Sequence, residues 1–510
     1  MKSVAGDHWG FLATCAVYLL FSLFGLDAIP RPFGDEAWYA IPTLQLVEQN
    51  TLNIPVIPGR GDISVAYVQP KLALNLLSWL PVSLFGAELA VFRLVSLSVT
   101  MLAALCLYVF TLRMCGKGVA LTACVAFLIC FWTVLCGRCF RPEIFATSFS
   151  LAALTCAVEG RLRNSSALIA LAALSSVLAL LSHQVVWLFL PPALFLVGRP
   201  HMDSHLHGRV LGPGDRSFLK RYALWLVVLI SPYLIYVVTS VLGAPTAALL
   251  DQFYGEGGSS EWSIAAMVDQ VTVKFARFFL LPRGLFFLLA SVAGAVLLWR
   301  TPRTRPVAHV IVAGLVVLSV VPLTKPRYLF VLAPYLSIGI AQLVGARATG
   351  YWGKVLFALY VCSMLAVNVA VYSNHRDASY ADVVSQLREV IPDGVVVAGP
   401  LVFALGLYTE DYQVTNVSPT FAARKDVRPR LWLNSRLQRS DYILEVTSTL
   451  FSTGGLGPRP ERFRSMEHLK ALGEFLDQNA VLVSTIPSRD YGPIRVWKRT
   501  NKLSGATDSQ

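Results

Sequence analysis

The chain has 510 residues, of which 55% are hydrophobic and 14% are charged. Soluble proteins carry about a quarter charged residues, so this composition excludes an ordinary soluble enzyme. It indicates a polytopic membrane protein, at least through the first three quarters of the chain. The formal net charge is +13, but many lysines and arginines fall in short loops between apolar runs, where they set membrane topology. We therefore predict that the protein does not bind nucleic acid.

Apolar runs long enough to cross a membrane, about 20 residues each, recur as far as residue 373. The first run ends without a small-residue cleavage site, so we interpret it as a retained helix and not as a signal peptide. The sequence predicts about eleven spans, near residues 9–29, 89–112, 118–137, 144–160, 165–181, 184–198, 222–242, 278–299, 307–323, 328–346 and 354–373.

The charges of the loops predict the orientation. With the N-terminus in the cytoplasm, every loop on the cytoplasmic side is basic, as the positive-inside rule requires, and the opposite loops hold acidic residues. An odd number of spans then places the C-terminal part outside. We predict a multi-pass protein of the inner or plasma membrane with a periplasmic or extracellular C-terminal domain. The residues predicted to face the cytoplasm include Arg113, Lys117, Arg161, Arg163, Lys220, Arg221, Arg300 and Arg305.

Two outer loops are more than linkers. Residues 42–50 and 71–85 have helical apolar spacing, and we expect helices lying in the membrane interface. A deeper span at 72–86 is the alternative. The glycine-containing loop 243–277 is a candidate lid.

Beyond residue 374 the chain becomes polar, and its apolar runs are too short to span. We predict a membrane domain at 1–373, an extracytoplasmic α/β domain at 374–500 and a disordered tail at 501–510. The strands are expected at 395–399, 442–446, 481–484 and 494–497, and the helices at 381–391 and 466–479.

Three charged segments lie at the outer ends of spans, at residues 34–39, 138–143 and 325–328. We expect them to meet on one side of the membrane. In the first segment, Asp35 and Glu36 are candidates for a base that deprotonates an acceptor hydroxyl. The alternative is that they favour the start of a following helix.

The other two segments are rich in cations. Arg138 and Arg141 offer planar forks that suit a phosphate, although an ion pair with Glu143 that pins helix ends is the alternative. Lys325 and Arg327, followed by Tyr328, break the positive-inside trend. An anionic ligand would explain this exception, and chance is the alternative.

With these segments, the chain resembles the GT-C superfamily of glycosyltransferases, and most closely the branch of the lipid A aminoarabinose transferase and the protein O-mannosyltransferases. The resemblance also covers the plan of many spans followed by an outer α/β domain. The stretches that carry it are residues 33–40, 67–72, 92–94, 138–143 and 325–328, with Pro334.

The resemblance implies a polyprenyl-phosphate-linked sugar as donor, bound at the outer face. It makes Asp35 the base or acceptor-orienting carboxylate, accompanied by Glu36. It leaves metal dependence open, so we name no certain cofactor and keep a divalent cation as an option. The residues that it implies in organising the site and holding the donor phosphate are Arg138, Arg141, Glu143, Lys325, Arg327 and Tyr328.

One departure from the aminoarabinose branch concerns the donor. That branch typically has Glu-Lys-Pro-Pro-Leu where this chain has Val-Gln-Pro-Lys-Leu at 68–72. The phosphate-binding lysine of the branch aligns with Gln69, and Lys71 lies two residues further on. Both stay candidates for donor binding, and aminoarabinose transfer to lipid A is disfavoured.

The sequence thus predicts an inverting glycosyltransferase that is embedded in membrane lipid and that transfers the sugar to an envelope glycan, lipid or protein. The rival class is a transporter or lipid flippase, which predicts ionisable residues within spans and broken helices. A non-catalytic scaffold is the third interpretation. Two further features are predicted to be structural. The polar residues 182–184 are interpreted as a helix-end cap. Cys136 and Cys139 form a CxxC pair, which we interpret as buried apolar residues because no second pair completes a metal site.

Overall fold

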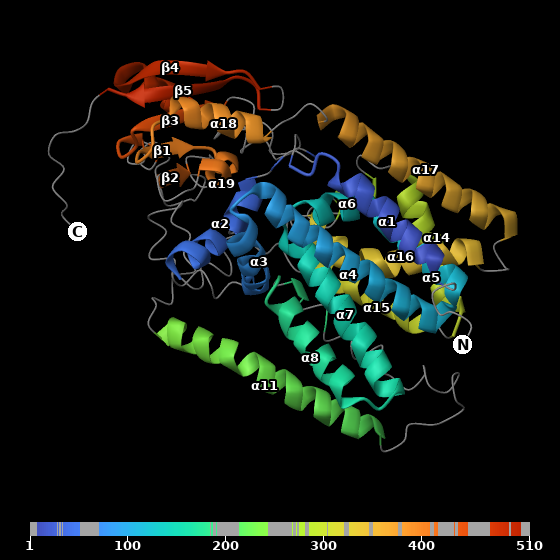
Figure 1. Ribbon diagram of the computed structural model, residues 1–510. Coiled ribbons are helices and arrows are strands. Elements are labelled where there is room, and N and C mark those ends of the chain that lie inside the picture. The colour runs from blue at the N-terminus through green and yellow to red at the C-terminus, as the bar shows by residue number, and fades with distance from the viewer. Residues whose placement is uncertain are drawn as a thin grey trace. The chain divides into compact units, whose positions relative to one another are not determined.

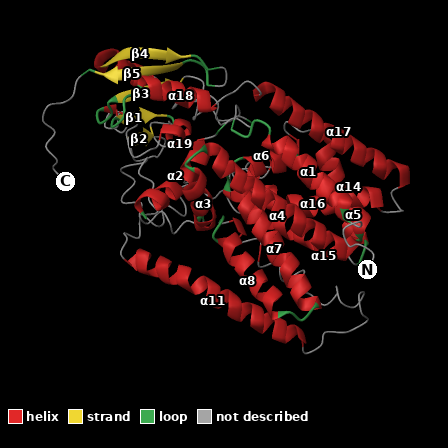
Figure 2. Ribbon diagram, in the orientation of Figure 1, coloured by secondary structure: helices red, strands yellow, loops and turns green. Residues whose placement is uncertain are grey.

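The structure is a computed structural model, and its described residues are largely helical as far as residue 390 and include a sheet after that point (Figure 2). The chain divides into two compact units. Unit 1 comprises the described residues of 1–24, 65–78 and 93–373, and unit 2 those of 25–64, 79–92 and 374–510. The described residues are 8–50 (without 28, 30, 31 and 33), 71–186 (without 184), 190, 214–242, 268, 272, 275–280, 285–320 (without 303), 326–345, 350–375, 380–407, 413–416, 433, 437–446, 470–488 and 491–500.

Unit 1 is a helical bundle (Figure 1). Helix α7 is its most buried element: every residue of its first nineteen except Cys156 is buried. By contrast, α11 and α17 expose many leucine, valine and tryptophan side chains, as helices that face lipid do. The elements are α1 (Trp9–Leu23), α5 (Lys117–Ile129), α6 (Phe131–Arg138), α7 (Pro142–Leu162), α8 (Ser166–Leu180), α11 (Gly214–Leu242), η3 (Ala276–Leu280), α14 (Leu285–Arg300), α15 (Arg305–Val320), η4 (Pro326–Leu332), α16 (Ala333–Gly345) and α17 (Gly350–His375), with parts of α3 (Leu72–Phe85) and α4 (Leu89–Cys115).

The apolar helices make the chain an integral membrane protein. Within the described residues, four helical stretches are long and apolar enough to cross a bilayer, and α5 with α6 forms a fifth if the two count as one broken span. Shorter apolar helices occupy other predicted spans. The predicted total of eleven stays a prediction, and most of the run 184–198 and of the candidate lid 243–277 lies outside the described residues.

The break between α5 and α6 has a specific cause in packing. The two helices meet at Cys130 with a bend of 64°, which interrupts the usual ladder of main-chain hydrogen bonds. Side chains of α17 satisfy the carbonyls near the break: the Tyr360 hydroxyl donates to Ala126 O at 2.7 Å, and Asn368 Nδ2 donates to Ile129 O at 2.9 Å. The bend is therefore held by polar groups of a neighbouring helix.

A close helix crossing supports the segment η4. Gly294 of α14 lies against Gly339 of α16, and a Cβ added at Gly294 would come within 2.3 Å of the Gly339 carbonyl carbon. Small residues let membrane helices approach in this way. Because α16 continues directly from η4, this crossing fixes the base of the segment that carries Arg327 and Tyr328.

Unit 2 contains a five-stranded mixed sheet of order β2-β1-β3-β5-β4. The first three strands in that order are parallel and the last two pairings are antiparallel. A core of Leu, Ile, Ala and Phe side chains packs one face against the helix at 470–479. Strand β2 was not expected from the sequence. The elements are α2 (Gly34–Gln49), α18 (Tyr380–Val390), β1 (Val396–Gly399), η6 (Leu401–Phe403), α19 (Ala404–Leu407), β2 (Gln413–Asn416), β3 (Tyr442–Val446), β4 (Ala480–Ile486) and β5 (Ile494–Arg499).

Substitution of Gly294 tests the helix crossing. Gly294→Ala should lower the stability of the detergent-solubilised protein by about 1–3 kcal/mol, because the new methyl group has no room against the main chain of α16. The measurement is thermal unfolding. Gly118→Ala is the control, since a Cβ there meets nothing within 4 Å. Equal stability of the two variants would contradict the close crossing.

Candidate active site

The site begins where α6 ends and α7 begins. The chain leaves α6 after Arg138 and is extended at Arg141 (φ −137°, ψ 141°) before Pro142 opens α7. A proline favours an extended residue before it and suits the first helical position, because it has no N–H to leave unpaired. Glu143 therefore lies in the first turn of α7, where the helix dipole favours a negative charge.

Glu143 is the centre of a buried ion cluster. Arg141 Nε lies 3.3 Å from Glu143 Oε2, and Arg327 Nε lies 2.6 Å from Glu143 Oε1. The side chains of Glu143 and Arg141 are only 2% and 4% exposed, whereas Arg327 is 19% exposed. Two guanidinium groups against one carboxylate give these three side chains a formal charge of +1. In a site shielded from water, this charge favours an anion.

His183 and Tyr328 lie beside this cluster. Their rings meet edge to face with centroids 4.7 Å apart, and the Arg327 guanidinium carbon lies 5.9 Å from the centre of the Tyr328 ring. The main-chain N–H of Val185 donates to His183 Nδ1 at 3.1 Å. The neutral imidazole therefore carries its proton on Nε2. This bond fits a helix-end cap, and the same ring also adjoins a predicted donor-binding residue.

Lys71 belongs to the same part of unit 1. It lies just before α3 and is buried. The main-chain N–H of Ala73 donates to the carbonyl of Leu181 at 3.2 Å, two residues before His183. The start of α3 is thus bonded to the segment that carries His183.

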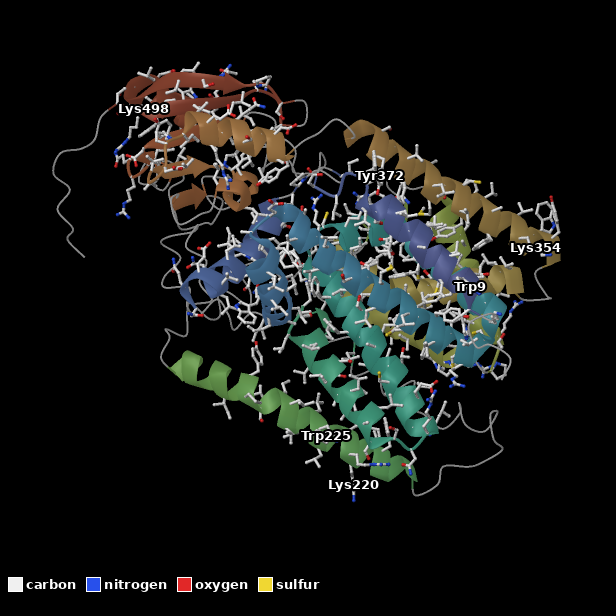
Figure 3. All side chains as sticks on the ribbon, viewed as in Figure 1. Trp9, Lys220, Trp225, Lys354, Tyr372 and Lys498 are labelled. Atoms are coloured by element: carbon white, nitrogen blue, oxygen red, sulfur yellow. The ribbon has the colours of Figure 1, made fainter. Side chains whose placement is uncertain are left out.

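Arg138 has a different environment. Its Nη2 donates to Phe24 O at 2.8 Å and its Nη1 to Phe21 O at 3.4 Å. Its guanidinium also lies 4.7 Å from the centre of the Tyr372 ring, which is labelled in Figure 3. The carbonyls at the end of a helix lack intrahelical donors, so Arg138 satisfies the end of α1 and holds it near α17. A role of Arg138 in donor binding stays a prediction.

The first charged segment lies in unit 2. Asp35 and Glu36 occupy the first turn of α2, with Glu36 buried and Asp35 half-buried. This position agrees with the alternative in which the helix dipole favours them. Their meeting with the other charged segments stays a prediction. Gln69 and Lys325 lie outside the described residues.

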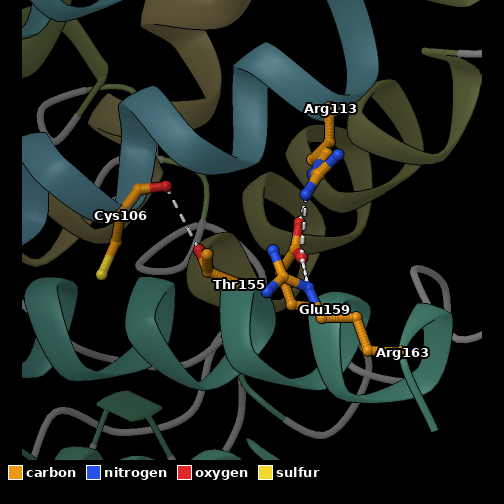
Figure 4. Close-up of polar contacts among 5 residues, drawn as sticks. All are labelled: Cys106, Arg113, Thr155, Glu159 and Arg163. Atoms are coloured by element: carbon orange, nitrogen blue, oxygen red, sulfur yellow. Dashed lines mark hydrogen bonds and ion pairs between the residues drawn. The ribbon is translucent and has the colours of Figure 1, made fainter. Parts of the chain in front are cut away.

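A second ion cluster, which the sequence did not predict, lies at the other end of α7 (Figure 4). Glu159 is paired with Arg113 of α4 and with Arg163, whose Nε donates to Glu159 Oε2 at 2.7 Å. Arg113 and Arg163 had been interpreted only as topology signals. Glu159 falls inside the predicted span 144–160, and an ionisable residue in such a run is the signal that could have found the cluster.

No family model and no curated protein sequence matches this chain, but solved structures share its fold. ArnT from Cupriavidus metallidurans bound to undecaprenyl phosphate superposes with a TM-score of 0.61 at 14% identity, over 99% of this chain and 100% of that chain. AglB, the oligosaccharyltransferase of Archaeoglobus fulgidus, in complex with an inhibitory peptide and a dolichol-phosphate, gives 0.54 at 11% identity, over 99% of this chain and 76% of that chain.

The chain has the fold of a GT-C glycosyltransferase. The apo form of the Archaeoglobus fulgidus oligosaccharyltransferase agrees, with a TM-score of 0.54 at 13% identity over 88% of this chain and 71% of that chain. The GT-C resemblance seen in the sequence is thereby confirmed at the level of the fold.

In the part of the chain that the structure describes, no three His, Cys, Asp or Glu side chains are grouped so that they could hold a metal ion. Cys136 and Cys139 are buried free thiols.

The two carboxylates of α7 provide a matched test of burial. Glu143→Gln should destabilise the protein by about 3–5 kcal/mol, because it leaves two buried guanidinium groups without their countercharge. Glu159→Gln should lower the free energy of unfolding by about 1 kcal/mol, since the side chains of Arg113 and Arg163 are 49% and 61% exposed and water can solvate them. Thermal unfolding in detergent measures both, and similar losses would contradict the assigned burial.

Proposed function

We propose that the protein is an inverting glycosyltransferase that moves a sugar from a polyprenyl phosphate to an acceptor at the outer face of the membrane. The observation that carries the proposal is the buried cluster of Arg141, Glu143 and Arg327, within a GT-C fold. ArnT and AglB, which share that fold, have been solved with undecaprenyl phosphate and dolichol-phosphate.

The charge of the cluster suits the proposed leaving group. A polyprenyl-phosphate sugar is a phosphodiester with one negative charge, and the polyprenyl phosphate that leaves is a monoester with a charge of about −2 at pH 7. One negative charge therefore develops on the phosphate during transfer. The three clustered side chains have a formal charge of +1, so they can stabilise that developing charge without donating a proton.

Arg327 is the cation that we assign to direct phosphate contact. It is the most exposed member of the cluster, and Glu143 orients it at 2.6 Å. Arg141 is almost completely enclosed and supports the same carboxylate from the other side. Tyr328 and Lys71 complete the proposed donor pocket, with Gln69 and Lys325 as the motif-based candidates that accompany them.

The proposed reaction needs one base and no covalent intermediate. The acceptor oxygen attacks the anomeric carbon from the face opposite the phosphate, and the bond from that carbon to the phosphate oxygen breaks. Its electron pair leaves with the phosphate, and the configuration inverts. We assign Asp35 as the carboxylate that takes the acceptor proton, with Glu36 beside it in the motif. The acceptor is an envelope glycan, lipid or protein.

A lipid flippase is the second candidate, because one observation favours it. The bend of 64° between α5 and α6 is a broken helix, and Glu159 is an ionisable group on a buried helix, two features of transport pathways. Against it, polar side chains of α17 hold the bend, and Glu159 is paired with two arginines at the end of its helix. Neither feature therefore requires a path through the bilayer.

The lipid pools of living cells test the function. Cells that make Asp35→Asn should accumulate one polyprenyl-phosphate sugar relative to cells that make wild type, because the donor is supplied but not consumed. Mass spectrometry of the lipid extract, at matched membrane abundance of the two proteins, identifies that sugar. Identical lipid pools would remove Asp35 as the base and would favour the flippase, which moves a lipid without consuming it.

The phosphate contact has its own test in the purified protein. Arg327→Ala should bind undecaprenyl phosphate at least about tenfold more weakly than wild type, because a charge-assisted pair is lost. Arg327→Lys should recover only part of the affinity, since Lys lacks the planar fork. Arg305→Ala removes the same charge from an exposed position on α15 and serves as the control. Wild-type affinity in Arg327→Ala would exclude the assigned contact.

A further inference from the structure

The second ion cluster lies far from the candidate active site along the same helix. Glu159 follows Glu143 by sixteen residues, which is about 24 Å along a helix axis at 1.5 Å per residue. The two clusters thus lie at opposite ends of α7. The proposed transfer reaction uses nothing at the Glu159 end.

Arg163 is held by a hydrogen bond, but its side chain is largely exposed. Its Nε donates to Glu159 Oε2, and the carboxylate is further held by Arg113 of α4. Glu159 is 8% exposed, whereas Arg163 is 61% exposed. An arginine held at its Nε still has donors on its two terminal nitrogens, because the fork has five donors.

A second guanidinium is held across the adjoining turn. Arg221 of α11 donates through Nη2 to Asn164 Oδ1 at 2.7 Å and through Nη1 to Ser166 Oγ at 3.2 Å. Asn164 follows Arg163 directly and adopts a positive φ of 49°, which turns the chain into α8. Arg163 thus begins the turn between α7 and α8, and Arg221 of α11 is hydrogen-bonded to that same turn.

Exposed apolar side chains lie beside these cations. Leu162 ends α7, and Leu171 and Leu174 lie on the exposed side of α8. Leu219 and Leu224 are exposed on α11, on either side of Arg221. Helix α11 packs along α8, where the Tyr222 and Ser176 hydroxyls lie 2.7 Å apart, and Figure 3 shows Lys220 and Trp225 on the same helix.

We propose that Arg163 and Arg221 bind the phosphate headgroup of an anionic phospholipid, whose acyl chains lie along the exposed leucines of α8 and α11. The leaflet is the one opposite the candidate active site. A lipid fits better than a soluble anion because the cations and the apolar surface adjoin each other, so one ligand satisfies both. By the charges of the loops, this side is the cytoplasmic one, where anionic lipids gather. The proposal is independent of the transferase function.

Lipid titration of the full-length protein in neutral detergent tests the proposal. Native mass spectrometry should detect phosphatidylglycerol retained by wild type at concentrations where phosphatidylcholine is lost. Arg221→Gln should weaken phosphatidylglycerol retention about fivefold, the effect of one cation near a lipid surface. The Arg221→Gln substitution leaves the ion pairs of Glu159 intact, so we expect the variant to fold. Arg163→Lys, which keeps the charge but loses the fork, should weaken retention less.

Two further arms separate the lipid from other anions. Arg305→Gln removes one exposed cation on α15, also predicted to face the cytoplasm, and should retain lipid as wild type does. Glycerol 3-phosphate, the soluble headgroup, should not displace the lipid at millimolar concentration. Three results would each overturn the proposal: equal lipid retention by Arg221→Gln and wild type, equal retention of the two lipids by wild type, and loss of the lipid on addition of glycerol 3-phosphate.

Discussion

The buried contact between Glu143 and its two arginines is the constraint on which the candidate site depends. It joins the first turn of α7 to η4, two segments separated by more than 180 residues of chain. A buried charge is tolerated only when it is paired, so neither segment can move alone without exposing or stranding a charge. The helix crossing at Gly294 supports η4 through α16, which follows it. The polar contacts of α17 hold the bend between α5 and α6, and α6 leads into α7. These contacts support the two segments that carry Glu143 and Arg327, the most exposed member of the cluster.

The helices could be predicted well because lipid imposes a simple rule. A span needs about 20 apolar residues whose main-chain groups bond within the segment, and α4, α7, α8 and α17 follow the predicted runs closely, whereas α1 ends at Leu23, six residues before the end of its predicted run. Strand β3 was predicted with its bounds, since a compact run of Tyr, Ile, Leu and Val between polar residues is typical of a buried strand. Strand β2, Gln-Val-Thr-Asn, was missed because it is short, only one of its four residues is apolar, and its Asn favours turns.

The residues of the Glu143 cluster could be named from the sequence, but their pairing could be offered only as an alternative. Arg141, Glu143, Arg327 and Tyr328 were singled out because charges at the ends of apolar runs are costly without a use. Which of them meet depends on tertiary packing, which sequence spacing does not contain. The Arg–Glu alternative describes the observed contacts, since Glu143 pairs with two cations, and anion binding by their excess positive charge stays a proposal. Arg138 was grouped with them by motif, although its hydrogen bonds go to the end of α1. Sequence adjacency therefore did not distinguish a cation that supports a helix end from one in the cluster.

The ionic pairs at both ends of α7 also bear on how the protein meets bilayers of different thickness. A displacement of α7 along its axis by one turn would break two contacts together, that of Glu143 with Arg327 and that of Glu159 with Arg113, so both ends of α7 are tied to neighbouring elements. A thicker or thinner membrane must then be accommodated elsewhere, by tilting of helices that face lipid. Helices α11 and α17, with their exposed apolar faces, are suited to that adjustment. The geometry of the cluster at Glu143 would accordingly be insulated from the lipid composition around it.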